Sequence, residues 1–198
     1  MSVILKDRAK KYIMDWNVSD SSIDVLQFGY TQSGPTYSLQ YEKTFKIGSG
    51  DTEPIWGSWY DTTSQYAPVA GTATPMYCDS GSGNGIRKVF GSNFEVDYSG
   101  TYNLQFSAQL DQASGSGEHI YIWFRKNGVD IPNSASEVAL QGTTAESIPS
   151  WNYIFELNAG DYINVMYSVT NTNVHLKAVS STPVVPAIPS VIITMWKL

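Results

Sequence analysis

The chain has 198 residues, with 12 Lys and Arg against 18 Asp and Glu, and a formal net charge of −6. Charged residues make up 15% of the sequence, against about 25% in a typical soluble domain, so the chain lacks the basic character of a nucleic-acid-binding domain. Hydrophobic residues make up 42%, which is enough to build a core and excludes a disordered chain.

The first 16 residues have apolar side chains at helical spacing. Leu5, Ala9, Tyr12, Ile13 and Trp16 recur three and four residues apart, which predicts a short amphipathic helix over 2–16. Two interpretations are open: an ordinary helix packed on its own domain, or a basic docking element for a larger assembly. For docking we expect the contacts to come from Leu5, Lys6, Arg8, Lys10, Lys11, Tyr12 and Trp16.

Targeting and membrane signals are not expected in this sequence. The apolar stretch at the start is stopped by Lys6, whereas a signal peptide needs a run of about 7–15 apolar residues. No stretch reaches the roughly 18 apolar residues of a membrane span. We therefore expect folding in a host cytoplasm and no membrane insertion.

A linker is predicted between two parts of the chain. Tyr37, Leu39 and Tyr41 alternate with polar residues and indicate one or two strands within 17–54. The Gly- and Ser-containing stretch 48–54 then marks a boundary. We expect an N-terminal segment, 1–54, and a head domain, 55–198.

The head domain is expected to be all-β. Five alternations of apolar and polar residues over Thr101–Leu110 indicate a half-buried strand, and Asn127-Gly128 is typical of a two-residue hairpin turn. Counting similar segments gives eight or more short antiparallel strands and no helical pattern after residue 16. This pattern predicts a β-sandwich or jelly roll.

Catalytic and metal-binding motifs are not found. His119 and His175 lie on predicted strands without a metal-ligand spacing, so exposed strand positions are expected for them. Cys78 is the one cysteine and is expected to be a small buried apolar residue. We expect no enzyme activity, no cofactor and no metal.

Aromatic residues are unusually abundant, with six Trp and thirteen Tyr. Three uses remain open for them: burial between subunits, where Tyr and Trp are enriched, coverage of the domain's own core, or a stacking platform for a sugar.

Three motifs in the head resemble the tumour-necrosis-factor-like superfamily, which includes the globular heads of complement and collagen-like proteins. Phe94–Phe106 follows its F-x-V-x-x-x-G-x-Y-x-x-x-F pattern. Arg125–Val129 is similar to its K-N-G hairpin, and Leu157–Ile163 to its L-x-x-G-D element.

The sequence more closely resembles uncharacterised structural proteins of tailed bacteriophages with that fold. The similar segments cover residues 55–198 and are Gly57–Gln65, Phe106–Leu110, Ile122–Gly128, Trp151-Asn152, Leu157–Tyr162 and Pro186–Ile192.

This resemblance implies a ten-strand jelly roll that forms a homotrimer at a virion surface. Aromatic residues on bulky strand faces or strand ends would line the trimer interface, and we expect Tyr121, Trp123, Tyr162 and Trp196 there. The favoured role is a capsid decoration, cement or short head-fibre protein, which docks on the major capsid protein or another virion protein through residues 1–54.

Two other functions remain open. A receptor-binding tail fibre or tail-tip knob would contact host surface glycan through loops such as Asp111–Glu118 and Gly142–Ser150. An enzyme acting on envelope polysaccharide would need a pair of carboxylates held across a groove.

Overall fold

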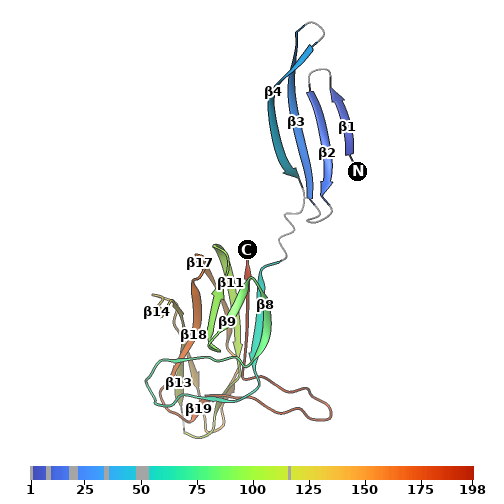
Figure 1. Ribbon diagram of the computed structural model, residues 1–198. Coiled ribbons are helices and arrows are strands. Elements are labelled where there is room, and N and C mark those ends of the chain that lie inside the picture. Colours follow the sequence, from blue (N-terminus) through green and yellow to red (C-terminus); the bar gives the residue numbers. More distant parts are fainter. Residues whose placement is uncertain (1, 8–9, 18–21, 34–35, 48–53, 116) are drawn as a thin grey trace. The chain divides into compact units, whose positions relative to one another are not determined.

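The computed structural model describes residues 2–7, 10–17, 22–33, 36–47, 54–115 and 117–198, with side chains from residue 54 onward. Every element in these ranges is a β-strand (Figure 1). The chain divides into two compact units, Met1–Glu53 and Pro54–Leu198, which we call the N-terminal unit and the head.

The N-terminal unit is a four-stranded antiparallel sheet in which neighbouring strands follow one another along the chain. The strands are β1 (Ser2–Asp7), β2 (Lys10–Asn17), β3 (Ser22–Ser33) and β4 (Thr36–Ile47).

The expected helix over 2–16 is therefore wrong, because the described residues of this stretch, 2–7 and 10–16, lie in β1 and β2. Its β-branched and aromatic residues, such as Ile4, Ile13 and Trp16, favour strands. Eight residue pairs also join β2 to β3, and this long-range pairing is invisible to a short helical window.

The head contains two large antiparallel sheets. Sheet 1 has the order β17-β11-β20-β5-β8, with bounds β5 (Trp56–Asp61), β8 (Ser80–Asn84), β11 (Gly100–Ala108), β17 (Ser150–Leu157) and β20 (Val191–Lys197). Sheet 2 is built on the order β13-β18-β10-β9, with bounds β9 (Ile86–Val89), β10 (Asn93–Val96), β13 (Glu118–Lys126) and β18 (Tyr162–Val169). Three short strands extend sheet 2: β14 (Val129–Asp130) and β15 (Ser136–Leu140) pair with β13, and β7 (Thr74–Pro75) pairs with β18.

One apolar core joins the two sheets. On β11, Tyr102, Leu104 and Phe106 alternate with polar residues and are fully buried, as the sequence predicted. Across the core, the ring centroids of Phe106 and Phe124 lie 6.1 Å apart, and those of Phe124 and Phe155 lie 5.4 Å apart. The head is therefore all-β and consistent with a β-sandwich.

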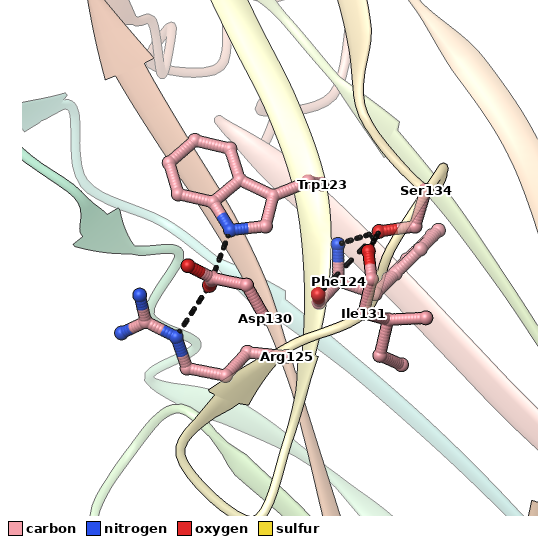
Figure 2. Close-up of polar contacts among 6 residues, drawn as sticks. All are labelled: Trp123, Phe124, Arg125, Asp130, Ile131 and Ser134. Carbon is pink, nitrogen blue, oxygen red and sulfur yellow. Dashed lines mark hydrogen bonds and ion pairs between the residues drawn. The ribbon is translucent and has the colours of Figure 1, made fainter.

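A side chain fills a gap in the pairing of β13. Pairing with β15 ends at Ile122 and pairing with β14 begins at Arg125, so Phe124 has no ladder partner on this edge. Its backbone N–H instead donates a 3.1 Å hydrogen bond to Ser134 Oγ (Figure 2). The Ser134 hydroxyl in turn donates to the carbonyl of Ile131 at 2.8 Å.

A third sheet contains β19 and lies at the end of the head away from the C-terminus (Figure 1). This end sheet has the order β16-β12-β19-β6, with bounds β6 (Gln65–Tyr66), β12 (Leu110–Gln112), β16 (Glu146–Ser147) and β19 (Val174–Leu176). The Ile55 carbonyl accepts a hydrogen bond from the N–H of Lys197, so both ends of the head lie together, away from the end sheet (Figure 1).

Candidate functional site

The outward face of sheet 1 is uncharged over most of its area. Trp56 pairs directly with Trp196, and Tyr60 with Ile192. Most of its side chains are apolar or carry an amide or hydroxyl group, and these are Trp56, Ser58, Tyr60, Thr101, Asn103, Gln105, Ser107, Ser150, Asn152, Ile154, Ile192, Thr194 and Trp196. The charged side chain of Glu156 also lies on this face, on the edge strand β17, where it accepts a 2.7 Å hydrogen bond from the hydroxyl of Thr101. We call it the uncharged face. An uncharged, aromatic-bearing sheet surface has the composition of a protein–protein contact.

The outward face of sheet 2 is different, because charges there are paired within the chain. Asp130 Oδ1 accepts 2.7 Å hydrogen bonds from Arg125 Nε and Trp123 Nε1 (Figure 2). Both bonds lower the pKa of Asp130, and the bond from Arg125 has the larger effect. The Tyr121 hydroxyl donates to Glu137 Oε1 at 3.0 Å, which raises the pKa of Tyr121. These polar groups have partners within the head.

The four residues expected at a trimer interface do not share one surface. Tyr121 and Trp123 lie on β13 and Tyr162 begins β18, so these three belong to sheet 2. Trp196 lies on β20 and belongs to the uncharged face of sheet 1. Alternation along one strand cannot assign an outward residue to a particular sheet, because that depends on pairing between distant segments.

The end sheet carries a row of polar side chains that the sequence analysis missed. Its register places Glu146 opposite Asp111, Asp111 opposite His175, and His175 opposite Tyr66. Lys177 follows β19, two residues after His175, and its ammonium contacts both carboxylates. We call these five residues the end-sheet row.

Stacking and ion pairs hold the end-sheet row together. The rings of Tyr66 and His175 are parallel within 12°, with centroids 4.5 Å apart. His175 Nε2 and Lys177 Nζ each lie 3.6 Å from Asp111 Oδ2. The hydrogen bond to Glu146 is the main cause that raises the pKa of Lys177, so its ammonium stays charged.

The expectation of exposed histidines is wrong for His175, which is 6% exposed and whose Nδ1 has no hydrogen-bond partner. His119 is half-buried, and its Nδ1 lies 2.7 Å from Glu137 Oε1. The sequence around β19 gives no sign of this burial, because the ring that stacks on His175 belongs to Tyr66, which is more than a hundred residues away in the chain.

Other predicted residues are placed as follows. Cys78 is buried, as expected. Among the docking residues, Arg8 lies outside the described residues, whereas Leu5 and Lys6 lie on β1, and Lys10, Lys11, Tyr12 and Trp16 lie on β2. The two loops expected to contact glycan, Asp111–Glu118 and Gly142–Ser150, contain no aromatic residue.

In the described ranges, no three His, Cys, Asp or Glu side chains are grouped to hold a metal ion. A search of the same ranges for a helix able to cross a membrane finds none. Compared with known proteins, the chain matches no family model and no curated protein.

Proposed function

We propose that this chain is a non-enzymatic structural protein of a tailed-bacteriophage virion. In this proposal it is a homotrimeric capsid decoration, cement or short head-fibre protein. The N-terminal unit docks on another virion protein, and the head is a jelly roll exposed at the particle surface. The assignment to phage rests on the resemblance of residues 55–198 to such proteins.

The strand order supports a jelly roll. Along the chain, β5 and β8 belong to sheet 1, β9 and β10 to sheet 2, β11 to sheet 1, and β13 and β15 to sheet 2. The last three long strands, β17, β18 and β20, then alternate between the sheets. Repeated crossing between two antiparallel sheets is the pattern expected for a jelly roll.

The uncharged face is the observation that carries the proposed trimer. Charged groups on sheet 2 already have partners, whereas the uncharged face exposes Trp56, Tyr60, Ile154 and Ile192. Contact between copies must be self-complementary or cyclic, and a face whose charge is confined to Glu156, on the edge strand β17, limits like-charge repulsion in either arrangement. Of the four interface residues expected from the sequence, the proposed interface therefore includes Trp196. It does not include Tyr121, Trp123 or Tyr162, because these belong to sheet 2.

The register of the N-terminal unit supports docking through its first hairpin. Lys6 lies opposite Lys11, and Asp7 lies opposite Lys10. Two directly opposed lysines favour an acidic partner surface. A trimer presents this hairpin three times, and linked binding sites raise the overall affinity through effective concentration.

Light scattering on the purified chain tests the trimer. We expect a mass of about 65 kDa, three times the monomer mass of 21.8 kDa. Ile192→Glu places a carboxylate in the uncharged face and should give monomers. Val184→Glu is the control, because Val184 is 89% exposed outside this face, and it should remain trimeric. A monomeric wild-type chain would overturn the proposal.

Docking is tested by sedimentation with capsids of the phage that encodes the chain, assembled without it. The wild-type chain should co-sediment with these capsids. The double variant Lys6→Glu and Lys11→Glu should bind more weakly while keeping its mass in solution. Equal binding by the variant would contradict docking through the first hairpin.

A further inference from the structure

The end-sheet row combines an open aromatic ring with a rim of charged groups. Tyr66 is 61% exposed, although one face of its ring stacks on His175. The register continues this line to Asp111 and Glu146, and the Lys177 ammonium lies against both carboxylates. The row therefore offers a ring, two acceptor groups and one donor group on one face of a small sheet.

The charges of the row exclude some classes of ligand. Two carboxylates against one ammonium give a negative surface, which repels phosphate, sulfate and nucleic acid. The Lys177 ammonium also occupies the position between Asp111 and Glu146, so a metal cation would have to displace it. A neutral ligand rich in hydroxyl groups meets neither obstacle.

A pyranose sugar has the matching chemistry. Its axial C–H groups form an apolar face that stacks on an aromatic ring, whose π-face is negative. Its hydroxyl groups donate to carboxylates and accept from an ammonium, and hydrogen bonds to charged groups are stronger than neutral ones. Tyr66 supplies the ring, whereas Asp111, Glu146 and Lys177 supply the charged partners.

The row is also held in place before any ligand arrives. The buried ring of His175 stacks on one face of the Tyr66 ring and restricts its movement. His175 Nε2 also lies 3.6 Å from Asp111 Oδ2. The contacts of Lys177 restrict its flexible side chain. Such preorganisation reduces the entropy lost on binding.

We propose that the end-sheet row, formed by Tyr66, Asp111, Glu146, His175 and Lys177, binds a neutral pyranose sugar. This site does not depend on the proposed trimer or on docking to a capsid, because all five residues come from one copy of the head.

Saturation-transfer NMR on the full chain tests the proposal with four probes: D-glucose, D-galactose, N-acetyl-D-glucosamine and L-rhamnose. At least one sugar should receive saturation, strongest at the C–H protons of one ring face. An oligomer of that sugar is then titrated. Tighter binding of the oligomer identifies a polysaccharide as the natural ligand, and equal binding identifies the free sugar.

Matched variants separate a binding role from a structural one. Tyr66→Ala should abolish the transfer, whereas Tyr66→Phe keeps the ring and should bind within about twofold of wild type. Asp111→Asn should weaken binding about tenfold, because it replaces a charged acceptor with a neutral amide. Tyr98→Ala is the control: Tyr98 is 56% exposed near Gly85 and Ile55, outside the row, and its loss should leave binding unchanged.

Two results would overturn the inference. One is the absence of transfer to all four sugars by the folded wild-type chain. The other is equal transfer by wild type and Tyr66→Ala. Thermal unfolding of each variant checks that it is folded, and Tyr66→Phe and Tyr98→Ala keep the test decisive if Asp111→Asn destabilises the head.

Discussion

Asn127 and Asp161 join two turns of the head that are 34 residues apart, through a 2.7 Å hydrogen bond from Asn127 Nδ2 to Asp161 Oδ1. Asp161 Oδ2 lies 2.8 Å from Lys126 Nζ and also accepts from the N–H of Asn158 at 2.8 Å. Asn127 Oδ1 accepts in turn from the N–H of Tyr162. The K-N-G and L-x-x-G-D motifs of the sequence therefore form one contact.

This contact predicts a stability change in acid. The hydrogen bond from Lys126 is the largest cause that lowers the pKa of Asp161, from 3.8 to about 2. A lowered pKa in the folded state stabilises the head above about pH 4, and this stabilisation is lost as the pH falls toward 2. We expect a loss of about 1 kcal/mol, since solvent screens exposed ion pairs.

Denaturant unfolding of wild type and Asp161→Asn at several pH values measures this effect. The gap in the free energy of unfolding between the two proteins should close as the pH falls. A gap that stays constant from neutral pH to about pH 2 would contradict the assignment to Asp161.

The position of Trp59 implies that adding a single methyl group at Gly57 lowers the free energy of unfolding substantially. Its indole lies over Gly57, where an added Cβ would fall 1.8 Å from Cη2 of the ring. Gly57→Ala must displace the buried indole, and we expect the free energy of unfolding to fall by about 2–3 kcal/mol. Chemical denaturation followed by tryptophan fluorescence measures this loss.

Gly142→Ala is the control for that substitution. Gly142 has a φ of +104° and no atom within 4 Å of an added Cβ, so only backbone strain acts there, at about 1 kcal/mol. If Gly57→Ala cost no more than Gly142→Ala, the close approach of Trp59 would not limit this position.

We expect the loss of the buried hydrogen bond of Ser134 to destabilise the head more than the loss of an exposed hydrogen bond. Ser134→Ala leaves the N–H of Phe124 without a partner inside the head and should cost about 2 kcal/mol. Trp123→Phe removes the surface bond to Asp130, which water can replace, and should cost about 0.5 kcal/mol. Thermal and denaturant unfolding compare the two, and equal losses would show that Ser134 does not replace the missing ladder bond.

Cys78 should be unreactive in the folded chain. It is 3% exposed, and burial raises the pKa of its thiol to about 12, so the reactive thiolate is scarce. A disulfide reagent at about pH 8 should label no thiol in the native protein and one per chain in guanidinium. Ser181→Cys adds an exposed thiol and should react at once. Rapid labelling of the native wild type would show that the site opens.

The same raised pKa gives a stability change in base. From about pH 9 to about pH 12 the unfolded chain loses the thiol proton while the folded chain retains it. The free energy of unfolding of wild type should therefore fall with pH over this window relative to Cys78→Ser. Denaturant unfolding at each pH measures the difference, and parallel curves would refute this cause.

Strand positions in the head were predictable from sequence where one face meets the core. Strand β11, Gly100–Ala108, alternates because Tyr102, Leu104 and Phe106 must be buried while their neighbours meet solvent. The expected strand continued to Leu110, whereas in the structure Leu110 begins β12 of the end sheet. The Asn127-Gly128 turn was predictable because both residues adopt positive φ. The same kind of reasoning failed over 2–16. The apolar residues there fit both the helical period of 3.6 residues and the strand period of two, and pairing of β2 with β3 favoured the strand.

The sequence by itself determined an all-β head, its main strands and a buried cysteine. Its Gly- and Ser-containing stretch also marked a boundary between two parts of the chain near residue 54. These properties depend on local alternation and turn chemistry, which neighbouring residues specify. Only the tertiary structure decided that Trp196 and Trp123 belong to different sheets, and that Tyr66 stacks on His175. Such relationships depend on which distant strands pair, and pairing is set by the burial of the whole core rather than by any one segment.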